Sequence, residues 1–181
     1  METIMDRAAV DQALDRMSRE IIAAHPETGR LMLIGIKTRG VFLARRLQAR
    51  IRAHCGITLP AGSMDITLYR DDWTRMADHP IVEATNILFS VDGRDLILVD
   101  DVLYTGRTIR AAMDAIMDFG RPDRIELAVL LDRGHRELPI QPDIVGLVID
   151  TLPEDQVNVR VVEVDGEDRV EMHRSLRPME A

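Results

Sequence analysis

The sequence predicts an α/β fold, with a mostly parallel central sheet flanked by helices. Apolar runs at 31–36, 96–99 and 125–131, the last interrupted only by Glu126, are typical of parallel strands that are buried on both faces. Segments with helical spacing of apolar residues lie between these runs, which is the order of strand–helix–strand units. At 181 residues the chain suits one domain, 1–181, that is large enough to bury its own core.

The spacing of apolar residues predicts the helices and strands in the first part of the chain. Helices are expected over residues 6–24 and 41–54, on either side of the buried strand at 31–36, because each has one apolar face. Alternation of apolar and polar residues predicts a strand over 64–69. The side chains expected to face the core from the two helices are Val10, Leu14, Met17, Ile21, Leu43, Leu47 and Ile51.

The later part of the chain continues the pattern. Residues 71–86 lack a sustained period and contain Pro80, and a long irregular segment of this kind is usually functional or disordered. A helix is expected after residue 108, with apolar Ile109, Met113, Ile116 and Met117. Further strands are expected at 87–89, 96–99, 125–131, 145–149, 157–164 and 169–172.

The stretch from 97 to 109 carries the strongest chemical signal. An apolar strand ends in Asp100 and Asp101, and the polar loop 104–108 then leads into a helix. First-turn N–H groups of a helix lack internal partners, so such a loop favours an anion, and Gly106 allows a close backbone approach. Carboxylates repel phosphate. The acid pair should therefore face sugar hydroxyls or a metal ion.

Other proteins also end a strand in two acids. Response-regulator receiver domains do so after their first strand and need a lysine near the end of the chain, but the only lysine here is Lys37, upstream of the pair. A P-loop would need Gly-x-x-x-x-Gly-Lys-Ser/Thr, which is absent. An ordinary strand, loop and helix with surface acids is the plainest alternative. It leaves unexplained why loops 37–40, 100–108 and 132–137 should all meet at one sheet edge.

Composition limits the functional classes. No apolar run approaches the ~20 residues of a membrane span, and no signal-peptide pattern is present. A lone cysteine, Cys55, cannot form an internal disulfide, which favours a cytoplasmic location. The net charge is −8, and residues 141–181 hold ten acids against four arginines. Such a balance disfavours general nucleic-acid binding, because phosphate contacts supply most non-specific affinity.

Residues 97–109 resemble the 5-phosphoribosyl-1-pyrophosphate (PRPP) signature of type I phosphoribosyltransferases. Three further strings extend this resemblance to the pyrimidine operon regulator family (PyrR): residues 35–40 (GIKTRG), 65–72 (DITLYRDD) and 132–140 (DRGHRELPI). The match runs from about residue 6 to 172, and the last string is the most specific. Members of this family are uracil phosphoribosyltransferases that also bind messenger RNA.

The resemblance implies that uracil and PRPP give UMP and pyrophosphate, with Mg²⁺ bound mainly by PRPP. It implies a small hood beside the sheet and a flexible lid at about 71–86. Catalytic roles fall to Asp100, Asp101, Arg39 and Arg70, and base contacts to Arg133 and Val157. PRPP and nucleotide binding is assigned to Thr38, Arg39, Asp100, Asp101, Val102, Leu103, Tyr104, Thr105, Gly106, Arg107 and Thr108.

The resemblance also implies a homodimer or higher homo-oligomer whose first helix contacts leader mRNA of pyrimidine genes. Arg16 and Arg19 are the candidate RNA contacts, but Asp15 stands where relatives commonly have a neutral hydroxyl residue. Leu147 stands where they commonly have lysine. Three hypotheses therefore remain: a bifunctional enzyme and regulator, a salvage enzyme without RNA binding, and an RNA-binding nucleotide sensor with little catalytic activity.

Overall fold

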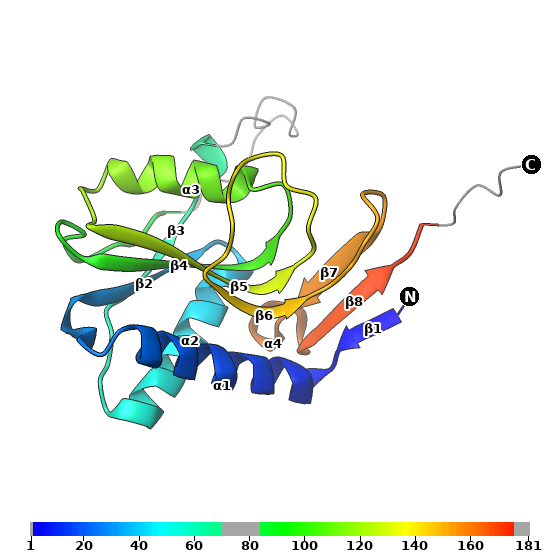
Figure 1. Ribbon diagram of the computed structural model, residues 1–181, viewed down its shortest axis with the longest axis horizontal. Coiled ribbons are helices and arrows are strands. Elements are labelled where there is room, and N and C mark those ends of the chain that lie inside the picture. The colour runs from blue at the N-terminus through cyan, green and yellow to red at the C-terminus, as the bar shows by residue number, and fades with distance from the viewer. Residues whose placement is uncertain (1, 70–83, 176–181) are drawn as a thin grey trace, which may run out of the picture.

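A computed structural model describes residues 2–69 and 84–175 and shows a five-stranded parallel sheet with helices on both faces (Figure 1). The strand order is β3-β2-β4-β5-β6. This architecture confirms the predicted α/β class. The elements of this layer are β2 (Leu31–Ile36), α2 (Arg39–Cys55), β3 (Ala61–Met64), β4 (Asp95–Leu103), α3 (Arg107–Met117), β5 (Arg124–Asp132) and β6 (Ile144–Val148).

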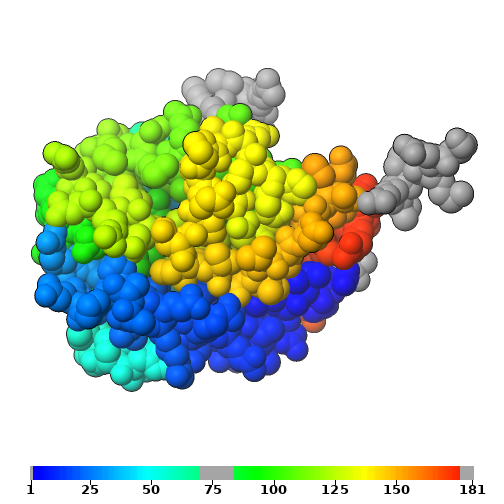
Figure 2. Space-filling model, in the orientation of Figure 1, coloured from blue at the N-terminus to red at the C-terminus, as the bar shows by residue number. Residues whose placement is uncertain are grey.

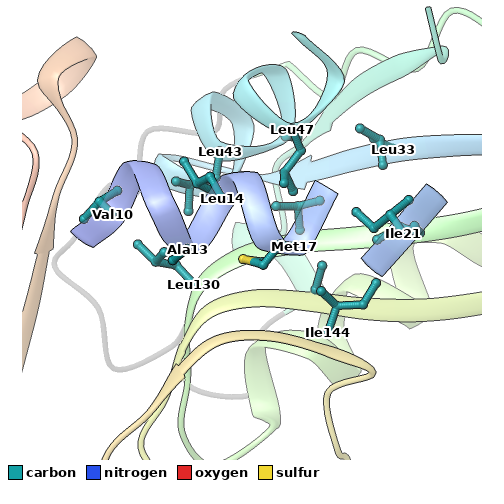
Figure 3. Close-up of a cluster of buried hydrophobic side chains, with 14 of the residues drawn as sticks. Val10, Ala13, Leu14, Met17, Ile21, Leu33, Leu43, Leu47, Leu130 and Ile144 are labelled. Atoms are coloured by element: carbon teal, nitrogen blue, oxygen red, sulfur yellow. The ribbon is translucent and has the colours of Figure 1, made fainter. Parts of the chain in front are cut away.

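Two hydrophobic clusters fill the spaces on the two faces of the sheet. Helix α1 (Arg7–Ala24) lies with α2 on one face, and α3 lies on the other (Figure 1). The predicted core face of α1 is confirmed, because its apolar side chains are buried against α2 and the sheet (Figure 3). The residues labelled there are Val10, Ala13, Leu14, Met17, Ile21, Leu33, Leu43, Leu47, Leu130 and Ile144. On α3, however, Met117 is 56% exposed and does not face the core.

A small antiparallel sheet, in the order β1-β8-β7, forms the hood. Its strands are β1 (Glu2–Met5), β7 (Gln156–Arg160) and β8 (Arg169–His173), with the short helix α4 (Val162–Asp165) between the last two. The first and last of these strands lie side by side at one end of the molecule (Figures 1 and 2). The expected hood is therefore present, although the sequence did not predict β1.

Ion pairs connect the hood to α2. Arg46 of α2 donates to the carboxylates of Glu163 and Asp168, at 2.6 and 2.7 Å. Arg39, the first residue of α2, donates twice to Asp165, at 2.8 and 3.0 Å. The hood and the start of α2 are therefore joined through charged side chains close to the carboxyl edge of the parallel sheet.

The strand expected over 64–69 is wrong. Strand β3 ends at Met64, and residues Thr67–Tyr69 form a 3₁₀ turn, η2. The Asp65 carboxylate accepts hydrogen bonds from the backbone N–H and the hydroxyl of Thr67, at 2.8 and 2.6 Å. A local side-chain acceptor thus replaces the strand ladder. A second 3₁₀ turn, η1, spans Thr28–Arg30.

Two other strand predictions need correction. Residues 87–89 form no strand, and the neighbouring Asn86 makes only an isolated bridge with Ser63. The strand expected over 157–164 ends at Arg160, because the Asp165 carboxylate accepts the N–H of Val161 and closes the α4 turn. Arg70 and most of the expected lid segment lie outside the described residues. Among the residues described, no helix is both long and apolar enough to cross a membrane.

Candidate functional site

Loops at the carboxyl ends of β4 and β5 are hydrogen-bonded to each other. The N–H of Arg133 donates to the carbonyl of Leu103 at 3.1 Å, and the N–H of Glu137 donates to the carbonyl of Thr105 at 2.9 Å. The loop after β2 approaches the same edge, since a Cβ added at Gly40 would lie 2.4 Å from the carbonyl oxygen of Val99 in β4. The three loops whose convergence the sequence predicted thus form one surface.

The acid pair lies within β4 rather than after it, because the strand continues to Leu103. Asp100 is 6% exposed, and its carboxylate accepts the N–H of Asp101 at 2.9 Å. The Asp101 carboxylate accepts the N–H of Val102 at 2.9 Å. Burial raises the pKa of Asp101, while hydrogen bonds from Asp100 and Val102 and the charge of Arg39 act in the opposite direction.

The loop after the acid pair has the geometry of an anion site. Gly106 has a positive φ of 91° and immediately precedes α3, whose first-turn N–H groups face this loop. The Thr105 hydroxyl lies 3.4 Å from the N–H of Arg107. The guanidinium of Arg107 pairs with Glu137 at 2.6 Å, so this cation also braces the neighbouring loop. Backbone N–H groups and hydroxyls are therefore the groups best placed to donate to an anion here.

The loop after β2 contains a cis peptide between Lys37 and Thr38, a feature that no residue pattern in the sequence reveals. The N–H of Lys37 donates to the carbonyl of Met64 at 2.9 Å. Thr38 is the N-cap of α2, which begins at Arg39, two residues earlier than expected. The guanidinium of Arg39 is turned to Asp165 of the hood, whose hydrogen bond raises the Arg39 pKa above its ordinary value.

The candidate base contact Arg133 is 7% exposed. Its guanidinium lies 4.2 Å from the centre of the Tyr104 ring and donates to the carbonyl of Leu152 at 2.9 Å. Its Nε atom is buried and has no acceptor among the described residues. Val157 on β7 is half-buried and packs against the hydrophobic cluster beneath α1, so its expected base contact remains a prediction.

Arg136 holds the 132–140 loop together, although no residue pattern in the sequence assigns it a role. It pairs with Asp132 at 2.6 Å, and both side chains are largely buried. Its other guanidinium N–H groups donate to the carbonyls of Tyr104, Gly134 and Ile140. The only available signal was its place within the string DRGHRELPI. One arginine thus fixes both the loop and its junction with the loop after β4.

The two candidate RNA contacts on α1 are both paired. Arg16 donates to the carbonyls of Val145 and Gly146 and lies 3.4 Å from Glu20. Arg19 pairs with Asp15 at 3.0 Å, and its side chain is 67% exposed. Nearby acids therefore offset the positive charge of this helix face.

No group of three or more His, Cys, Asp or Glu side chains among the described residues could by itself bind a metal ion. Two adjacent carboxylates, Asp100 and Asp101, nevertheless suit Mg²⁺, which is usually bound by one or two carboxylates together with substrate phosphates and water. The residues present therefore fit an ion held mainly by its substrate.

Comparison with known proteins gives a consistent result. The family model for the phosphoribosyl transferase domain matches residues 1–167. The bifunctional protein PyrR of Pelotomaculum thermopropionicum is 54% identical over 167 residues, which cover 92% of each chain. The bifunctional protein PyrR of a Listeria monocytogenes serotype 4b strain is 55% identical over 168 residues, covering 91% of this chain and 92% of the relative.

Solved structures show the same fold at low sequence identity. The hypoxanthine phosphoribosyltransferase of Trypanosoma cruzi has a TM-score of 0.72 at 14% identity, covering 96% of this chain and 97% of the other. A Leishmania tarentolae HGPRT-ase in complex with GMP has a TM-score of 0.70 at 17% identity, covering 93% and 94%.

Proposed function

Because the chain belongs to the phosphoribosyl transferase family, in its group of bifunctional PyrR proteins, we propose that it transfers the phosphoribosyl group of PRPP to uracil, giving UMP and pyrophosphate. The single observation that carries this proposal is the acid pair of β4, buried Asp100 and half-buried Asp101, shortly before the anion loop at 104–108. In this order the acid pair would bind the ribose hydroxyls and the adjacent loop would bind the 5′-phosphate of the same substrate.

The proposed mechanism relies on positioning and electrostatics. As the bond at ribose C1 breaks, the sugar gains positive charge and pyrophosphate gains negative charge, so the protein must hold both ends. Thr105, Thr108 and the first-turn N–H groups of α3 would hold the 5′-phosphate, while Asp100 and Asp101 would bind the ribose hydroxyls. Mg²⁺ bound with PRPP would offset the charge of the leaving group.

The remaining roles belong to the flanking loops. The backbone at Thr38 and the guanidinium of Arg39 would hold pyrophosphate. Arg70 would supply a second positive charge that contacts the pyrophosphate. Arg133 would meet the base, supported by its buried guanidinium beside Tyr104, with Val157 as a second contact. We place this reaction in the cytoplasm, where a lone cysteine stays reduced.

The test is UMP formation from uracil, PRPP and Mg²⁺ by the purified full chain, with hypoxanthine and orotate as competing bases. Preferential use of uracil is expected. A folded protein that forms no UMP, or that uses another base in preference to uracil, would overturn the assignment.

For the second activity we propose uridine-nucleotide-dependent regulation of pyrimidine genes through leader mRNA, by a homodimer or larger assembly. The relatives' shared name, bifunctional protein PyrR, and the exposed Arg16 and Arg19 support it. Binding to the leader RNA of the protein's own pyrimidine genes, with and without UMP and at two salt concentrations, tests the proposal. Tighter binding with UMP is expected.

The acid partners of those arginines favour a second candidate, a salvage enzyme without RNA binding. Asp15 accepts from Arg19 and also contacts His54 at 2.8 Å, which leaves little net positive charge on this face. Protein that forms UMP but binds no leader RNA would select this alternative. RNA binding by protein that forms no UMP would instead select the nucleotide-sensing regulator.

A further inference from the structure

Three consecutive backbone carbonyls, those of Thr151, Leu152 and Pro153, accept hydrogen bonds from side chains of the candidate site. His135 lies 2.6 Å from the first carbonyl oxygen, and Arg133 donates to the second at 2.9 Å. The hydroxyl of Tyr104 donates to the third at 3.3 Å. The position of this short segment, 151–153, therefore sets the positions of the side chains around the proposed base contact.

Asp155 holds this segment in place. It is a buried acid, 3% exposed, that no part of the mechanism uses. One carboxylate oxygen accepts the N–H of Leu152 at 2.8 Å, and the other accepts the N–H of Ser175 at 2.9 Å. The carboxylate thus joins the 151–153 segment to the chain that follows the hood strand β8.

Packing alone does not hold the segment on this side. A cavity of about 350 Å³ lies beside Asp155 and is lined by Asp150, Thr151, Leu152, Asp155, Arg174 and Ser175. Leu152 lines this space, so the segment has room to move on this side. The N–H of Asp155 donates to the carbonyl of Leu152 at 3.1 Å and the hydroxyl of Thr151 donates to the carbonyl of Arg133 at 3.1 Å, and the Asp155 carboxylate adds the bond to the N–H of Leu152. The N–H groups of Leu152 and Ser175, with the charges of Arg174 and Arg133, hold the pKa of Asp155 below its usual value.

We propose that Asp155 is a positioning residue for the nucleobase. By accepting the N–H of Leu152 it holds the residue whose carbonyl accepts from the Arg133 guanidinium, and so orients that guanidinium. By accepting the N–H of Ser175 it makes that orientation depend on the chain after β8. The proposal rests on the proposed function, in which Arg133 meets the base. Asp155 itself touches no substrate.

The measurement that distinguishes a positioning role from a merely structural one is the change in the KM for uracil relative to the change in the KM for PRPP. Asp155→Asn keeps the shape of the side chain but replaces one acceptor with a donor that faces a backbone N–H. The KM for uracil should rise about five- to ten-fold, the effect of one lost hydrogen bond, while the KM for PRPP stays within about two-fold. A residue that merely stabilises the hood would lower the unfolding temperature and leave this KM ratio unchanged.

The matched control is Glu154→Gln. It removes one negative charge from the adjacent exposed position, and Glu154 takes no part in the loop's hydrogen bonds among the described residues. Wild-type KM values are expected for it. An equal rise in the KM for uracil in this control would show that the effect is one of overall charge and would overturn the proposal.

A second pair of variants tests the bond to Ser175 without changing Asp155. Ser175→Pro removes the backbone N–H, whereas Ser175→Ala retains it. The proline variant alone should raise the KM for uracil. If both behave as wild type, the link to the chain after β8 is refuted.

A double-mutant cycle tests whether Asp155 acts through Arg133. In an Arg133→Lys background, Asp155→Asn should change the KM for uracil by less than about two-fold, because coupled residues are non-additive. Full additivity would refute the proposed route. If wild-type protein forms no UMP, the proposed function fails. If wild type is active and Asp155→Asn keeps the wild-type KM ratio, the positioning role alone fails.

Discussion

Replacing Gly40 by alanine should test how closely the start of α2 must approach β4. A Cβ at this position would lie 2.4 Å from the carbonyl oxygen of Val99 and 3.2 Å from the Cα of Asp100. Both obstacles are backbone atoms of a central strand, so the side chain cannot turn away from them. To regain an ordinary contact of about 3.5 Å, the 37–40 loop would have to withdraw by roughly 1 Å.

This displacement has two expected consequences. Overpacking of this kind costs about 1–3 kcal/mol of unfolding free energy. A shift of about 1 Å in a substrate-positioning loop can lower kcat/KM by roughly 100-fold. Because the loop carries Thr38 and Arg39, the loss should appear in kcat/KM for PRPP.

Urea unfolding and steady-state UMP formation measure the two effects. The matched control is Gly29→Ala, since Gly29 is exposed and an added Cβ would meet nothing within 4 Å. That control should keep wild-type activity and stability. If Gly40→Ala retained both the wild-type unfolding free energy and the wild-type kcat/KM for PRPP, the close approach of α2 to β4 would not be what positions the loop.

The remaining predictions concern side chains. Asp101→Asn should keep the fold, as measured by thermal unfolding, yet lose most UMP formation; wild-type turnover would contradict its sugar-binding role. Arg136→Leu should cost about 3 kcal/mol in urea unfolding because it leaves the buried Asp132 carboxylate without its cation, whereas Arg110→Leu, which breaks the exposed pair with Asp114, should cost less than about 1 kcal/mol. The hydrogen bond from Arg39 holds the pKa of Asp165 below its usual value, so this carboxylate stabilises the fold above its unfolded pKa and loses that effect as the pH falls from about 5 to 3. The unfolding free energy of Asp165→Asn should therefore decline less steeply over that range, and an unchanged slope would rule out this contribution.

The sequence predicted the parts of the fold that depend on local period and on strand direction. The buried strand at 31–36 and the core face of α1 follow from apolar spacing alone. The meeting of three loops follows because the carboxyl ends of parallel strands share one edge. These inferences need no knowledge of which distant residues touch.

The features that were predicted wrongly or not at all depend on individual hydrogen bonds and ion pairs rather than on apolar spacing. The strand predicted over 64–69 is absent because the Asp65 carboxylate accepts two hydrogen bonds from Thr67 and so stabilises a 3₁₀ turn there. Asp165 was missed because its partner Arg39 lies 126 residues away in the sequence. Asp155 was missed because its partners are backbone N–H groups, which every residue except proline carries and which therefore give no residue pattern. Strand β1 is only four residues long and has no apolar period. Long-range pairing of this kind leaves no mark in a single sequence.

The pairing of β1 with β8 has a consequence for the order in which the protein can assemble during synthesis. All five strands of the parallel sheet have been made once residue 148 leaves the ribosome. Strand β1 is made before them, but it cannot pair until its partner β8, residues 169–173, has also been synthesised. The catalytic sheet can thus form while the hood is still incomplete. Interrupted translation would then leave a molecule that carries Asp100, Asp101 and the 104–108 loop but not Ser175, which anchors Asp155.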